Sequence, residues 1–146
     1  MAALTADKVR DVRPGGAIAI PVPVAASTTI YLGSIVNVNS SGFAVAGAND
    51  TSHECMGVAK EYVDNSAGSN GDLTVMVEFG QVEKFDSTGI TQADVGKSAY
   101  VLDSGTVGDD GAASKNVHIG TIVRLVTTNV CEIHVLPRPA VTAQPT

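Results

Sequence analysis

Short runs of apolar and β-branched residues alternate with turn residues along most of the chain. The clearest run is 73–79, where Leu73, Val75, Val77 and Phe79 share one face of a strand and polar or flexible side chains occupy most of the other. Further strands are predicted at 30–38, 43–46, 55–59, 81–85, 98–102, 117–126 and 130–136. We therefore expect an all-β fold, a small closed or nearly closed β-barrel or sandwich, because such a fold must protect its strand edges.

Helical spacing does not persist for three turns anywhere in the sequence. Only residues 91–95, in which Thr91 precedes Asp94 by three positions, resemble a capping pattern and predict a single helical turn. Gly80 stands between two extended runs and predicts a bulge or bend at that point.

The first 29 residues differ in character from the rest. Pro21 and Pro23 interrupt an apolar run, and a proline cannot donate a hydrogen bond to a sheet, so this run is not expected to be a central strand. Residues 1–29 are therefore predicted to form an extended amino-terminal arm. A β-domain is predicted over 30–137 and a short tail over 138–146. The alternative is an edge strand packed on its own domain.

Composition narrows the class of function. The net charge is −6 and no cluster of Lys and Arg exceeds the pair Arg10 and Arg13, which argues against a nucleic-acid ligand. Aromatic residues make up 4 % of the chain and Trp is absent, so little is available for stacking on sugar rings. No apolar run approaches 18 residues, so no membrane partner is expected. We expect synthesis in the cytoplasm with Cys55 and Cys131 reduced and buried as small hydrophobes, a disulfide being the alternative.

Candidate chemistry is sparse in the sequence. The histidines His53, His118 and His134 lack the spacing of metal ligands and are expected to face solvent or to bond locally. Asp109 and Asp110 lack the pattern of a calcium loop. No nucleophile elbow and no phosphate-binding loop is present. We therefore predict no catalytic residue, no metal ligand and no cofactor, and a protein that is not an enzyme.

The order of several motifs resembles a known family. The motifs are Tyr31 to Val38, Met56 to Ala59, Val77 to Val82, Gln92 to Val101 and Gly120 to Val123. In this order they are similar to the small capsid decoration, or cement, proteins of tailed bacteriophages. The resemblance implies a virion protein that is made in the host cytoplasm, binds the major capsid protein on the outside of the head as a homotrimer, and stabilises the expanded shell.

The arm is the predicted interface with the coat or with a neighbouring subunit. Its candidate contact residues are Arg10, Arg13, Ile18, Ile20, Pro21, Val22, Pro23 and Val24. The alternatives are another phage structural component, from the tail or the head–tail connector, and a small ligand- or carbohydrate-binding β-domain.

Overall fold

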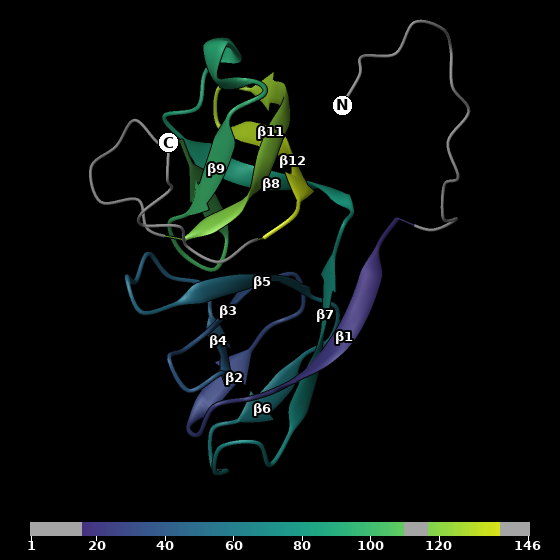
Figure 1. Cartoon of the computed structure of the whole chain (residues 1–146), viewed down its shortest axis with the longest axis vertical. Coiled ribbons are helices and arrows are strands. Elements are labelled where there is room, and N and C mark those ends of the chain that lie inside the picture. The colour runs from purple at the N-terminus through teal and green to yellow at the C-terminus, as the bar shows by residue number, and fades with distance from the viewer. Residues whose placement is uncertain (1–15, 110–116, 138–146) are drawn as a thin grey trace, which may run out of the picture.

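The computed structural model describes residues 16–109 and 117–137, and within these ranges the fold is almost entirely β (Figure 1). The elements in chain order are β1 (Ile18–Pro23), β2 (Thr28–Ile30), β3 (Ile35–Val38), β4 (Ala44–Ala46), β5 (Glu54–Ala59), β6 (Val63–Asn65), β7 (Thr74–Phe79), β8 (Val82–Thr88), the 3-10 helix η1 (Gln92–Asp94), β9 (Ser98–Val101), β10 (Thr106–Gly108), β11 (His118–Thr127) and β12 (Val130–Val135). The predicted all-β fold with a closed barrel is confirmed, and the helical turn expected at 91–95 is η1.

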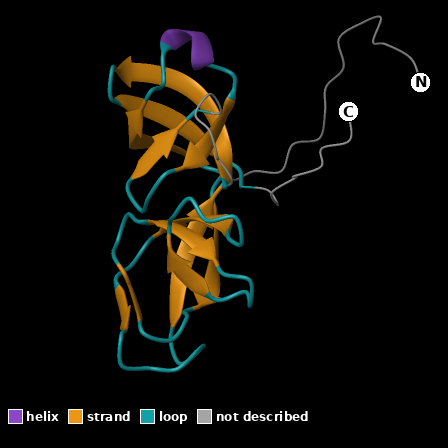
Figure 2. Ribbon diagram, turned by 90° about the vertical axis from the view of Figure 1, so that its left-hand side faces the viewer, coloured by secondary structure: helices purple, strands orange, loops and turns teal. Residues whose placement is uncertain are grey.

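The strands form two lobes stacked along the long axis of the molecule, which Figure 2 shows from the side. The barrel lobe, β8 to β12, is a closed barrel in the order β10-β8-β12-β11-β9. Its neighbours are antiparallel except for the parallel pair β8 and β10. Closure leaves this lobe without a free strand edge.

The sheet lobe, β1 to β7, contains a five-stranded sheet in the order β1-β7-β5-β3-β4 and the separate pair β2 and β6. This sheet also curls toward closure. Val24, just after β1, forms a parallel bridge with Ala44 of β4, and the N–H of Ala25 donates to the carbonyl oxygen of Ala44 at 3.0 Å. The two outer strands of the sheet therefore meet at one end.

The two lobes share a hydrophobic core. Ile35, Cys55 and Val58 of the sheet lobe are buried in the same cluster as barrel residues such as Phe85 and Ile133. The N–H of Ile35 also donates to the carbonyl oxygen of Ser104 at 2.8 Å. The other buried residues of the sheet lobe form a second cluster. Separating the lobes would expose the shared cluster, so its burial stabilises their contact.

The predicted boundary between the arm and the β-domain, at residue 30, is wrong for the part of the arm that the structure describes. Residues 18–23 are β1, which pairs antiparallel with β7 from Ile18 opposite Phe79 to Pro23 opposite Thr74. Val22 and Val24 are buried in the core of the sheet lobe. The alternative, an edge strand packed on its own domain, is the observed one, and the predicted arm over residues 1–15 lies outside the described residues.

The two prolines occupy the outward positions of this edge strand. The N–H of Val24 donates to the carbonyl oxygen of Leu73 at 2.9 Å, so alternate residues of β1 face β7. Pro21 lies opposite Met76, whose carbonyl oxygen accepts from the N–H of Lys60 on the other side of β7. Pro21 and Pro23 therefore sit where an N–H would point to solvent, and the ladder loses nothing.

Gly80 makes the bend between β7 and β8 that the sequence predicts. Its φ is +96°, a conformation that favours glycine, and its N–H donates to the carbonyl oxygen of Val135 at 2.6 Å. A Cβ at this position would lie 2.7 Å from the carbonyl oxygen of Gly16. The start of β1 and the end of β12 thus flank the point where the chain passes from one lobe to the other.

Candidate protein-binding surface at the lobe junction

Two tyrosines and a leucine form an exposed apolar group that we call the aromatic patch, Tyr31, Leu32 and Tyr62. Their exposed fractions are 65, 67 and 56 %. The rings of Tyr31 and Tyr62 are in contact, with centroids 5.5 Å apart and planes inclined by 38°. Large side chains this exposed and this close together are typical of a surface that another protein covers.

Local structure explains why the patch is exposed. Ile30 of β2 and Val63 of β6 are buried partners across the pair, so the residues that follow and precede them, Tyr31 and Tyr62, face outward together. Leu32 is at the tip of a turn in which the N–H of Ser34 donates to the carbonyl oxygen of Tyr31 at 3.1 Å. Gly33 adopts φ +86°, as the third position of such a turn requires.

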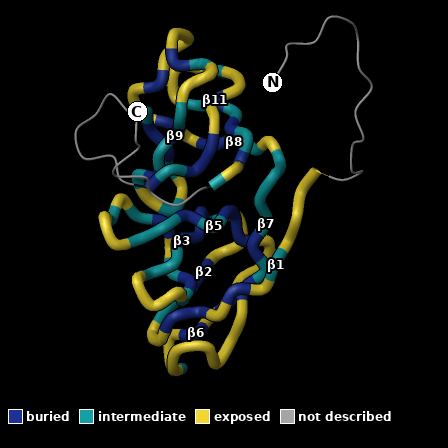
Figure 3. Tube along the Cα trace, in the orientation of Figure 1, coloured by how far each residue is buried: buried dark blue, intermediate teal, exposed yellow. Residues whose placement is uncertain are grey.

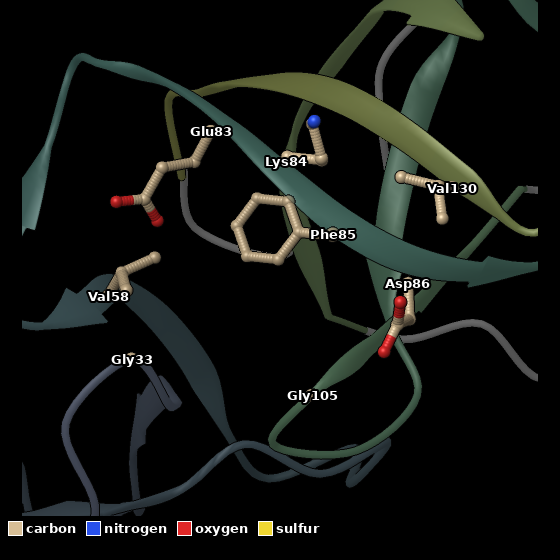
Figure 4. A pocket seen from close by; sticks show the side chains of 8 residues that line it. All are labelled: Gly33, Val58, Glu83, Lys84, Phe85, Asp86, Gly105 and Val130. Carbon is tan, nitrogen blue, oxygen red and sulfur yellow. The ribbon is translucent and has the colours of Figure 1, made fainter. Parts of the chain in front are cut away.

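A cavity of about 370 Å³ lies beside the aromatic patch, between the two lobes (Figure 4). Gly33, which follows Leu32 in the chain, is among its lining residues, whereas Tyr31, Leu32 and Tyr62 are not. Phe85 and Val58 provide its apolar lining, and the Glu83 carboxylate points toward Val58 in Figure 4. The other lining residues are Lys84, Asp86, Gly105 and Val130.

At the junction between the lobes, one lysine, Lys60, forms ion pairs with two glutamates. Lys60 Nζ lies 3.0 Å from Glu78 Oε1 and 2.5 Å from Glu83 Oε1. Desolvation disfavours the charged amine, but the hydrogen bonds to Glu83 and Glu78 outweigh it, and the pKa of Lys60 is raised. Lys60, Glu78 and Glu83 together carry a net charge of −1, and the ion pairs join Lys60 and β7 of the sheet lobe to β8 of the barrel lobe.

The predicted contact residues are only partly available on the surface. Ile18, Pro21 and Pro23 are exposed and Ile20 is partly exposed. Figure 3 shows that most of β1 is exposed. Val22 and Val24 are buried against their own domain, so they were wrongly predicted as contacts: their faces of β1 point into the core. Arg10 and Arg13 lie outside the described residues.

Sequence reasoning missed the aromatic patch. Tyr31 and Leu32 stood next to a Gly-Ser turn signal, which indicates a chain reversal and hence exposure. The pairing of Tyr31 with Tyr62 had no signal, because the two residues meet only through the β2–β6 register.

The histidines form local contacts, as expected. His53 Nδ1 lies 3.4 Å from Asn37 Nδ2 and its Nε2 lies 3.6 Å from Asp50 Oδ2. His134 Nε2 lies 3.1 Å from the carbonyl oxygen of Gly80, and the His118 ring meets Tyr100 edge-on at 5.8 Å. Within residues 16–109 and 117–137, no three His, Cys, Asp or Glu side chains gather as a metal site would require.

Both cysteines are buried and unpaired, which confirms their predicted role as small core residues. Burial raises the pKa of Cys55 to about 12 and also raises the pKa of Cys131. Thiols of this kind are unreactive at neutral pH because the reactive thiolate is scarce.

In the described part of the chain, no helix is long and apolar enough to cross a membrane. Comparison with protein-family models, with curated proteins and with solved structures found no match to this chain.

Proposed function

We propose that this chain is a non-enzymatic structural protein of a bacteriophage virion, which binds the major capsid protein on the outside of the head and stabilises the expanded shell. The aromatic patch is the observation that carries the proposal: three exposed apolar side chains next to a hollow at the lobe junction are suited to burial by a protein partner. The motif order from Tyr31 to Val123 supplies the identity of the partner.

Tyrosine is well suited to this role. Its ring offers a large contact area for two rotatable bonds, and tyrosines are enriched among the residues that dominate interface energies. A ligand that binds only the assembled shell stabilises that shell by mass action. Each copy that bridges neighbouring coat subunits therefore opposes the internal pressure of the packaged genome.

We propose that the protein acts as a homotrimer on the shell. The barrel lobe has no free edge, and prolines line the outer edge of β1, so subunits are expected to meet through side chains rather than by adding strands. Three copies bound to a symmetric position gain avidity from modest individual contacts. Arg10 and Arg13 are proposed to add contacts to an acidic coat surface.

The direct test is co-sedimentation of the purified protein with expanded heads and with precursor shells. The wild-type chain should pellet with expanded heads only. The variant Tyr31→Ser/Tyr62→Ser should fold normally, since both side chains are exposed, and should bind at least about 30-fold more weakly if the two sites lose about 2 kcal/mol together.

Val123→Ser is the matched control, because Val123 is an exposed apolar residue on β11 of the barrel lobe. Equal binding by all three proteins would exclude the aromatic patch as the contact. Absence of binding to heads by the wild-type chain would overturn the capsid proposal itself.

Carbohydrate binding is the second candidate, because exposed aromatic rings beside a cavity with carboxylates also suit a sugar. The inclination of 38° between the two rings disfavours it, since a flat sugar cannot stack on both. A glycan array that retains the wild-type chain but not the double tyrosine variant would favour this candidate over the capsid.

A further inference from the structure

The cavity between the lobes combines an apolar wall with carboxylates. Phe85 and Val58 supply the apolar wall. Figure 4 shows the Glu83 side chain on one side of the Phe85 ring and the Asp86 side chain on the other, while the amine of Lys84 points away from the ring. The carboxylates, rather than the amine, therefore border the apolar part of the cavity.

The charge around the cavity is negative. At its rim, Asp103 Oδ1 accepts the N–H of Gly105 at 2.8 Å, and it lies 3.9 Å from the position that a Cβ on Gly105 would take. Among the described residues of this region, four carboxylates face two amines, which leaves a net charge of −2: Glu78, Glu83, Asp86 and Asp103 against Lys60 and Lys84. Such a site favours a cationic group over an anionic one.

The size of the cavity indicates a small occupant. Its volume of about 370 Å³ lies near the lower end of the range of roughly 300–1,000 Å³ that is typical of ligand pockets. Gly33 of the sheet lobe and Gly105 of the barrel lobe line it without side chains, and a Cβ on either would meet open space or only Asp103. The cavity therefore has room for one long side chain of a partner.

We propose that this cavity binds the side chain of an arginine on a protein partner. The guanidinium group is planar and weakly hydrated, so it can pack on an aromatic ring and bond to carboxylates at the same time, whereas a lysine ammonium is compact and strongly hydrated. The aliphatic stem would pack on Val58 and Phe85, and the guanidinium would donate to Glu83 and Asp86.

Glu83 can take part although it already pairs with Lys60. The contact with Lys60 is made through Glu83 Oε1, and a carboxylate accepts hydrogen bonds at both oxygens. The chemistry of the site does not depend on the identity of the partner. That the arginine belongs to the major capsid protein rests on the proposed function.

Titration with a minimal probe tests the site without any capsid. Nα-acetyl-arginine amide is added to the isotope-enriched full chain, and Nα-acetyl-citrulline amide, its uncharged isostere, is the control probe. The arginine probe should shift the amide signals of Gly33, Phe85 and Gly105 saturably in the nuclear magnetic resonance spectrum, and the citrulline probe should not. Equal shifts from both probes, or no saturable shift at these residues, would overturn the inference.

Two charged residues of β8 give predictions of opposite sign. Asp86→Asn removes a carboxylate and should weaken binding of the arginine probe about threefold, whereas Lys84→Gln removes an amine and should strengthen it by a similar factor. Both side chains are exposed, so both variants should fold. A change of the same sign in both variants would contradict a charge-selective site.

Gly105→Leu tests the cavity by filling it, and Gly16→Leu is the matched control. Neither glycine has a positive φ and neither would carry a crowded Cβ, so both variants should keep the wild-type thermal melt. Gly105→Leu should weaken binding to the arginine probe and to expanded heads by at least about tenfold. Gly16→Leu, which does not line the cavity, should leave both unchanged.

The two assays separate the arginine site from the capsid proposal. Equal binding to heads by the two leucine variants would overturn the inference and leave head binding itself intact. A wild-type chain that binds the arginine probe at the cavity but does not pellet with heads would support the arginine site and overturn the capsid proposal.

Discussion

Val24, just after β1, forms a parallel bridge with Ala44 of β4, which joins the two outer strands of the five-stranded sheet. Val24 is fully buried, and the N–H of Ala25 bonds to the same alanine at 3.0 Å. The segment that the sequence suggests as a detachable arm is therefore what closes this lobe.

Deletion of residues 1–24 should abolish cooperative folding of the sheet lobe. It removes β1, two core valines and the closing bridge, and each fully buried valine contributes about 1.5–3 kcal/mol. Deletion of residues 1–15 should leave a cooperative thermal transition, measured by circular dichroism. A chain lacking residues 1–24 that melts like the full chain would show that β1 is dispensable.

Replacement of the two outward prolines should make the protein associate. Pro21→Thr/Pro23→Thr restores two N–H groups on the free edge of β1 and creates a strand that another chain can extend. Light scattering should detect concentration-dependent dimers or larger species. Ala19→Thr is the control, because Ala19 also faces outward but already has its N–H. Equal association by both variants would assign the effect to the side chains.

Gly80→Ala should destabilise the fold more than Gly89→Ala. Both glycines have positive φ, +96° and +77°, so each alanine incurs backbone strain of about 1–3 kcal/mol. Only at Gly80 does the new Cβ also meet backbone, the carbonyl oxygen of Gly16 at 2.7 Å, while Gly89 has open space. Urea denaturation should rank the two variants in this order. The reverse order would contradict the crowding at the lobe junction.

Stability should decline at alkaline pH through the buried thiols. The pKa of Cys55 is raised by burial from about 9 to about 12, so the unfolded chain loses this proton at a pH where the folded chain keeps it. The contribution of the protonated Cys55 thiol to the free energy of unfolding is complete below pH 9. It falls by at most about 1.4 kcal/mol per pH unit up to about pH 12. Denaturation midpoints of wild type and Cys55→Ala should converge over this interval, and parallel curves would refute the assignment.

Sequence by itself determined the strand-rich fold, the bend at Gly80, the turn at 91–95 and the exclusion of the proline-containing run of β1 from the centre of a sheet. These are local properties: alternation, glycine and proline chemistry act within a few residues. Tertiary structure alone decided that Val22 and Val24 face the core, because the local sequence does not determine which face of an extended segment becomes buried. It also brought Tyr31 to Tyr62 and Lys60 to Glu83, pairs 31 and 23 residues apart in the chain. Such contacts depend on strand register and on closure of the sheets, which arise when the core is buried as a whole.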